Sequence, residues 1–270
     1  MENLRRPDAA AAPGFAALVK QGLRRSALTG LRAALWWRSK PLCVAADRSC
    51  LVIAPHPDDE TLGCGGLIAH LRARHQAVDV VFLTDGDAAL VDHPLVTPRE
   101  LAAVRTREAR TALGILGVEP ERLHFLGAPD GRLSRLADAD RDRIATGLTS
   151  LLGRCQPADV LLPWRRDGSA EHEAAFALVA ATLPGQKPVP RLLEYPVWAW
   201  WSPRLLADLL VTAPGLLRLQ LLQSRDLKAR ALAAYRSQYQ AVAPWTTPVL
   251  PRGFADCFCG HFEYFIDANG

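Results

Sequence analysis

Short, mainly apolar runs alternate with longer amphipathic stretches through the middle of the chain. We expect strands in four such runs: 51–54, 78–83, 123–126 and 160–163. The stretches between them carry apolar residues at helical spacing, which predicts helices over 61–75, 99–116 and 137–154. Near-continuous apolar strands separated by helices are typical of a parallel sheet covered on both faces. The pattern predicts an α/β fold: a Rossmann-like, mostly parallel sheet with helices on both faces.

The N-terminal part of the chain has a different pattern. Residues 15–37 combine apolar residues at helical spacing with basic residues, which predicts an amphipathic helix. This helix either packs on the rest of the protein or lies on an anionic membrane surface. Residues 1–14 are polar and alanine-rich, and we expect them to be disordered. We therefore predict an N-terminal helical extension over 1–45 and a single domain over 46–270.

The C-terminal third is apolar and rich in aromatic residues. Its predicted elements are a helix over 173–182, an aromatic strand over 192–201, a helical hairpin over 204–222, a basic amphipathic helix over 225–240 and a final strand over 257–266. Interior charges argue against a membrane-spanning helix in the hairpin, which Pro214-Gly215 interrupts. The hairpin could be core, a lid or a membrane-docking face. In the aromatic strand, alternation places Trp198 and Trp200 on one face.

Composition narrows the class of protein. The chain has 270 residues, 49% hydrophobic and 22% charged, which suits one large globular core. The net charge is +4, and without a continuous basic run or a recognition motif we expect no nucleic-acid partner. The six cysteines form no Cys-x-x-Cys pair, and no signal-peptide pattern opens the sequence. A cytoplasmic protein is expected, with peripheral membrane contact as an open alternative; the sequence carries no signal for an oligomeric state.

Charged side chains gather directly after the first predicted strand, in the string His-Pro-Asp-Asp-Glu at 56–60. Three carboxylates and an imidazole within five residues repel or desolvate one another unless a cation binds them. Imidazole and carboxylate are ligands that zinc accepts, so His56 and Asp59 form half of a candidate zinc site. The charges therefore indicate metal chemistry at the carboxyl end of a strand.

The string His-Pro-Asp-Asp-Glu, placed between a strand and a glycine-rich helix start, resembles the signature of the LmbE-like (PIG-L) family of zinc-dependent N-acetylglucosaminyl deacetylases. The resemblance implies His56, Asp59 and His172 as metal ligands. It implies Asp58 as the general base that helps water attack an acetamide carbonyl. Zn²⁺ is the implied cofactor, although another divalent metal could use the same ligands, and no further cofactor is implied.

The resemblance also places Arg105, Asp130 and Ser169 on the substrate side. A helix-surface salt bridge with Glu108 is the alternative for Arg105, and a plain turn is the alternative for Asp130. Many family members have His-Pro-Asp-His where this chain has Ser169-Ala-Glu-His172. Because serine carries no positive charge, either Asp58 acts as both base and acid, or another donor replaces the histidine. The candidate donors are Arg165, Arg166 and His261.

A later part of the chain, Lys228 followed by Tyr235-x-Ser-Gln, also resembles a family motif and is expected to be structural. The resulting prediction is a zinc hydrolase that removes acetyl from a small or conjugated N-acetylglucosamine-type sugar. An amidohydrolase for a non-sugar amide and a non-catalytic carbohydrate-binding relative are the alternatives. Retention of Asp58 favours catalysis, since a receptor needs metal ligands but no base.

Overall fold

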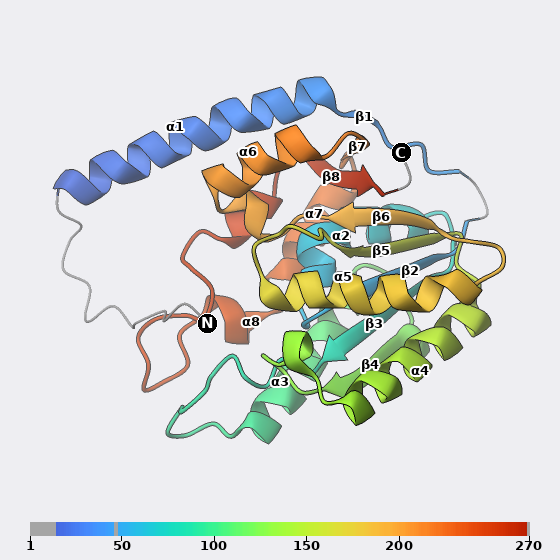
Figure 1. The fold of residues 1–270 in the computed structure, drawn as a ribbon. Helices are drawn as coiled ribbons and strands as arrows, with labels where there is room; N and C mark the ends of the chain where they lie inside the picture. The colour runs from blue at the N-terminus through green and yellow to red at the C-terminus, as the bar shows by residue number, and fades with distance from the viewer. Residues whose placement is uncertain (1–14, 46–47, 269–270) are drawn as a thin grey trace.

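Strands at the centre of the molecule form one sheet (Figure 1). The structure is a computed structural model that describes residues 15–45 and 48–268. Within these residues the sheet has eight strands in the order β1-β7-β8-β6-β5-β2-β3-β4. The strands are β1 (Lys40–Pro41), β2 (Cys50–Ala54), β3 (Val78–Thr84), β4 (Leu123–Ala128), β5 (Asp159–Pro163), β6 (Arg191–Tyr195), β7 (Leu216–Gln220) and β8 (Phe262–Asp267).

The sheet is mostly parallel, as predicted. Strands β4, β3, β2, β5 and β6 pair parallel to one another, and β1 pairs parallel to β7. Strand β8 lies antiparallel between β6 and β7. Every residue of β2 is buried, because the strand has a neighbour on each side and helices over both faces. This environment explains the unbroken apolar run in the sequence.

Helices cover both faces of the sheet (Figure 1). They are α1 (Phe15–Arg38), α2 (Asp59–Arg72), α3 (Pro98–Ile115), α4 (Asp138–Cys155), α5 (Ala170–Thr182), α6 (Pro203–Thr212), α7 (Ser224–Leu232) and α8 (Arg236–Tyr239). The core on one face includes side chains of α2, α3, α6 and α7, and the core on the other face those of α4 and α5. Alternation along β2 divides its side chains between the two: Val52 joins the first cluster and Ile53 the second.

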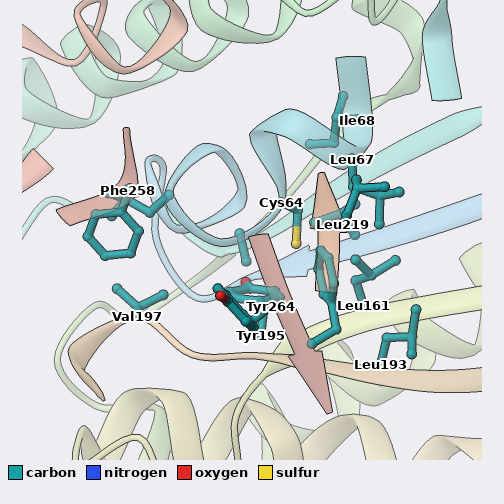
Figure 2. Packing of buried hydrophobic residues seen from close by; sticks show 14 of the residues in the cluster. Cys64, Leu67, Ile68, Leu161, Leu193, Tyr195, Val197, Leu219, Phe258 and Tyr264 are labelled. Atoms are coloured by element: carbon teal, nitrogen blue, oxygen red, sulfur yellow. The ribbon is translucent and has the colours of Figure 1, made fainter. Parts of the chain in front are cut away.

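Helix α2, which follows β2, packs closely on the sheet. Figure 2 shows part of its cluster, with Cys64, Leu67 and Ile68 of α2 among side chains of β5, β6, β7 and β8. A Cβ atom built on Gly63 would lie 2.2 Å from Cδ2 of Tyr195, so only glycine allows this approach. The Tyr195 hydroxyl in turn donates to the Ile53 carbonyl at 2.7 Å. The glycines in this helix therefore serve close packing.

Helix α1 packs on the domain, against α6 and β7. Its Leu28 and Leu35 are buried, and β1, directly after it, extends the sheet beside β7. At its C-terminal end Trp37 is 80% exposed. None of the helices in the described ranges is long and apolar enough to cross a membrane. A domain boundary at residue 45 and surface contact with a membrane stay predictions, and the expected disorder of residues 1–14 lies outside the described residues.

The predicted aromatic strand is wrong beyond Tyr195. Pro196 lacks an N–H for the ladder, and the next three N–H groups, of Val197, Trp198 and Ala199, all donate to the carboxylate of Asp167. The chain therefore turns into a short 3₁₀ helix, and the two tryptophans do not share a strand face. Trp198 packs on Phe254 and Trp200 on Tyr264 instead.

Three further predictions at the C-terminal end are corrected. The hairpin's second half is strand β7, because β1 and β8 pair with it on both sides. The basic helix is two helices, separated where Tyr235 leaves helical geometry at ψ 56°. The final strand begins at Phe262; Cys257 lies in a 3₁₀ turn before it and Cys259 directly after that turn, so neither is on a strand face. For the hairpin, strand pairing therefore overrides an ambiguous local pattern.

Candidate metal and catalytic site

The three predicted metal ligands meet beyond the carboxyl ends of the parallel strands, where open α/β sheets place their ligand sites. His56 follows β2, Asp59 begins α2, and His172 lies in the first turn of α5 after β5. Nδ1 of His56 is 3.1 Å from Asp59 Oδ2, and Nε2 of His172 is 3.4 Å from Asp59 Oδ1. One ligand atom from each of the three lies within 4.8 Å of the others. The tertiary structure thus brings together residues 116 positions apart in the chain (172 − 56).

A second carboxylate holds the far nitrogen of each imidazole. Asp167 Oδ2 is 2.8 Å from His172 Nδ1, and Asp130 Oδ1 is 3.1 Å from His56 Nε2. Histidines that bind metals usually have such a partner, which fixes the tautomer and the ring orientation. Asp167 is a site residue that the sequence analysis missed. The signal for it was a candidate ligand histidine that needs a partner for its second nitrogen, and an aspartate five residues earlier, in the loop that leads into α5.

The carboxylates of this site favour positive charge on its two histidines. Burial alone would lower the pKa of His172, but the charge of Asp59 and a hydrogen bond to Asp167 raise it to about 10. Burial likewise opposes protonation of His56, yet hydrogen bonds to Asp130 and Asp59 raise its pKa to about 9. Although burial opposes it, the charge of His172 holds the pKa of Asp59 well below its usual range.

The donor set fits a divalent metal that takes mixed ligands. Two imidazoles and a carboxylate, with a fourth position left for water, are the ligands of a catalytic zinc site. His56 also lies near Asp130 and Glu171, a second group with ligand atoms within 4.8 Å. That group offers one imidazole and two carboxylates, and Glu171 already accepts the Leu133 N–H at 3.0 Å. The set of His56, Asp59 and His172 therefore fits zinc better.

Asp58 lies directly beside the ligand set and is itself 5% exposed. Its backbone has φ 141°, a conformation that few residues other than glycine adopt. Its N–H donates to Glu60 Oε2 at 3.0 Å, and Nη2 of Arg105 is 3.2 Å from Asp58 Oδ1. Burial raises the pKa of Asp58 to about 8, against the opposing charge of Arg105. A strained, buried carboxyl with a raised pKa is typical of a functional group rather than a solvated turn.

Buried polar contacts fix the first turns of α2. Glu60 is fully buried and accepts from the hydroxyls of Thr61 and Tyr235. Further along α2, Lys228 donates to the Leu62 carbonyl and to Glu263, both at 2.7 Å. These contacts give the Lys228 and Tyr235 motif the structural role that the sequence analysis expected.

The predicted substrate-side residues have protein partners. Arg105 is 3% exposed and donates to the carbonyls of Pro57 at 2.6 Å and Gly86 at 3.0 Å. The alternative of a helix-surface salt bridge with Glu108 is wrong, because Glu108 accepts instead from the N–H and hydroxyl of Ser237.

Asp130, in addition to His56, accepts the Ala88 N–H at 2.7 Å. Ser169 caps α5 and accepts the His172 N–H. Contact between substrate and Arg105, Asp130 or Ser169 stays a prediction.

Of the candidate proton donors named from the sequence, the two arginines form ion pairs and the histidine lines another cavity. Arg165 forms an ion pair with Glu194 at 2.5 Å, and Arg166 forms one with Asp208 at 2.9 Å. His261 lines a separate cavity beside β8, together with Arg32 and Trp200.

Tyr239, which the sequence analysis did not single out, is a further candidate donor. Its hydroxyl is buried and has no hydrogen-bond partner among the described residues. Burial raises the pKa of Tyr239, and the next contributions are the charges of Asp58 and Glu60, which places the ring within electrostatic reach of the site. A ligand group that accepts a hydrogen bond would satisfy this hydroxyl.

The fold and the site define an α/β protein with a carboxylate-supported His–Asp–His centre at the end of a parallel sheet. The PIG-L family, described as GlcNAc-PI de-N-acetylase, matches residues 51–183. Residues 51–183 therefore match the PIG-L (LmbE-like) family, which confirms the resemblance noted in the sequence.

Individual relatives agree with this assignment. A 1D-myo-inositol 2-acetamido-2-deoxy-alpha-D-glucopyranoside deacetylase of Mycolicibacterium smegmatis is 32% identical over 142 residues, 45% of this chain and 47% of the relative. A diacetylchitobiose deacetylase of Thermococcus kodakarensis is 32% identical over 118 residues, 43% of this chain and 40% of the relative. The crystal structure of a conserved protein from Thermus thermophilus superposes with a TM-score of 0.59 and 28% identity, covering 82% of this chain and 94% of that one. This chain spans about half the length of the curated relatives it matches.

Proposed function

We propose that this protein is a metal-dependent N-deacetylase that acts on an N-acetylglucosamine-type conjugate. The observation that carries the proposal is Asp58, a buried carboxyl next to the ligands His56, Asp59 and His172 but outside the set. A receptor would need the ligands alone, whereas hydrolysis also needs a base. The names of the relatives, which are deacetylases of N-acetylated sugars, support the same class of substrate.

Zn²⁺ held by His56, Asp59 and His172 would acidify a water and polarise a carbonyl oxygen. The carboxylate of Asp58 would accept a proton from a water molecule while the oxygen of that water attacks the acetamide carbon. The C–N bond then breaks, and Asp58 returns the proton to the leaving amine, so that acetic acid and a free amine form. Arg105 keeps the carboxyl of Asp58 oriented through its contact at 3.2 Å.

Removal of the base tests this assignment. The Asp58→Asn variant should keep the metal and lose about 10²–10⁴-fold in turnover, the usual contribution of a general base. Metal content and amine release are measured on the same preparation. Turnover equal to that of the unchanged protein would remove Asp58 from the mechanism.

The hydroxyl of Tyr239 is our candidate for the donor that a histidine supplies in many relatives. A buried hydroxyl without a partner costs about 1–3 kcal/mol, which a substrate oxygen would recover. The Tyr239→Phe variant should therefore lower kcat/KM by roughly tenfold or more and leave folding intact or slightly improved. Unchanged kcat/KM would show that Tyr239 donates no hydrogen bond that stabilises the transition state.

The choice between a sugar and a non-sugar amide depends on the substrate panel. We would assay amine release from N-acetylglucosamine, its inositol, malate and chitobiose conjugates, and from simple aliphatic acetamides, with bound metal counted by mass spectrometry. Release from the sugar conjugates supports the proposal. Release from simple acetamides alone would favour an amidohydrolase, and bound metal without any release would favour the carbohydrate-binding alternative.

A further inference from the structure

A second group of metal-ligand side chains lies at the opposite end of the sheet. Asp79 is the second residue of β3, His124 the second residue of β4, and Cys155 the last residue of α4. The candidate active site lies beyond the other end of β3, at Thr84. At about 3.3 Å per residue, five residues of strand separate the two ends by roughly 16 Å. The group is therefore independent of the active site.

The three side chains are already close enough to share one ion. One ligand atom from each lies within 4.8 Å of the other two, and Asp79 Oδ1 is 3.0 Å from His124 Nε2. Around a tetrahedral zinc, with bonds of about 2.0 Å to nitrogen and oxygen and 2.3 Å to sulfur, ligand atoms lie roughly 3.3–3.5 Å apart. Small side-chain rotations would bring the present distances into that range.

Solvent reaches the group, and one oxygen of Asp79 faces His124. The side chain of His124 is 20% exposed, which leaves a path for an ion. Asp79 keeps its second oxygen in an ion pair with Arg122 at 2.9 Å. A metal that binds one carboxylate oxygen leaves this pair intact, and such outer contacts orient a ligating carboxylate. Arg122 also lies 3.5 Å from Glu119, so its charge has a second partner.

We propose that Asp79, His124 and Cys155 form a second metal site, for Zn²⁺ or a similar divalent transition metal, with water as the fourth ligand. Thiolate, imidazole and carboxylate together are the ligands of such ions and not of Mg²⁺ or Ca²⁺. On binding, the Cys155 thiol loses its proton to solvent as the sulfur–metal bond forms. The ion would join the ends of β3, β4 and α4, which is a structural role.

Cobalt substitution distinguishes the two sites. Metal-free full-length protein is titrated with Co²⁺, whose bond to a thiolate gives a near-ultraviolet charge-transfer band. The active-site ligands His56, Asp59 and His172 contain no sulfur, so the band reports the second site alone. We expect the band in the unchanged protein and in His172→Ala, and its loss in Cys155→Ser. The matched control is Cys43→Ser, which changes an exposed free cysteine and should keep the band.

Zinc stoichiometry and alkylation complete the test. The unchanged protein should bind one equivalent more than Cys155→Ser. In the unchanged protein, Zn²⁺ should protect Cys155, but not Cys43, from alkylation by iodoacetamide. This measurement uses no variant, so it does not depend on whether a variant folds. Absence of the cobalt band, its persistence in Cys155→Ser, or equal alkylation with and without Zn²⁺ would overturn the proposal. Amine release and the metal at the active site are measured separately, so failure here leaves the proposed function unaffected.

Discussion

Asp167 is the residue whose change should affect the proposed active site most specifically without removing a ligand. Its carboxylate is completely buried and accepts four donors: the N–H groups of Val197, Trp198 and Ala199, and Nδ1 of His172. Both oxygens act only as acceptors. In Asp167→Asn, one of them becomes an amide NH₂ that faces a donor. Nδ1 of His172 then favours its unprotonated form, and the proton moves to Nε2, the nitrogen that faces Asp59.

The size of the effect follows from these contacts. Loss of a carboxylate that orients a ligand histidine typically weakens metal binding by about 10–100-fold, or about 1.4–2.7 kcal/mol. Asp167→Asn keeps an acceptor oxygen for the backbone, so its loss of stability should be the smaller effect. Asp167→Ala removes every acceptor from three buried N–H groups. At about 1–3 kcal/mol each, that variant should lose about 3–9 kcal/mol of stability.

The assay combines metal competition with unfolding. Zn²⁺ affinity is measured against a chromophoric chelator, and the free energy of unfolding by urea titration of the metal-free protein. The matched control is Asp208→Asn, which breaks the exposed ion pair with Arg166 and should cost less than about 1 kcal/mol with no change in metal affinity. Unchanged zinc affinity in Asp167→Asn would refute the reasoning that the Asp167 carboxylate orients His172 for a metal.

Two other predictions concern pH and packing. In the metal-free protein the pKa values of His56 and His172 are about 9 and about 10, so both rings are protonated at neutral pH and a metal must displace both protons. Metal affinity should therefore rise with pH, by as much as about 100-fold per pH unit up to about pH 9 and by about tenfold per unit from there to about pH 10. Equal metal affinity at pH 6, 7 and 8 would contradict this. Gly63→Ala would place a Cβ 2.2 Å from the ring of Tyr195 and should lower the free energy of unfolding by about 1–3 kcal/mol. Gly153→Ala, with nothing within 4 Å, is the control, and equal stability of the two variants would show that the ring moves freely.

The corrected segments show where local pattern was insufficient. Residues 204–222 are apolar enough to form either a helix or a strand. The first half lies in helix α6, and the second half forms strand β7 because β8, from the C-terminal end of the chain, pairs with it. The aromatic strand ends at Tyr195 because the N–H groups of Val197 and Trp198 donate to the carboxylate of Asp167, which lies in the loop after β5. Neither partner is near in sequence, so no window of neighbouring residues contains the information.

The sequence by itself predicted the α/β class, the mostly parallel sheet and the candidate ligands His56 and Asp59, and the family resemblance added His172. It could do so because buried parallel strands need continuous apolar runs, and because a dense group of charges after a strand favours a bound cation. Only the tertiary structure decided which carboxylates support those ligands. Asp130 and Asp167 follow different strands, and the sheet brings each to the far nitrogen of one histidine. Such partners are selected by distance in space, which strand order and helix packing create and local sequence does not encode.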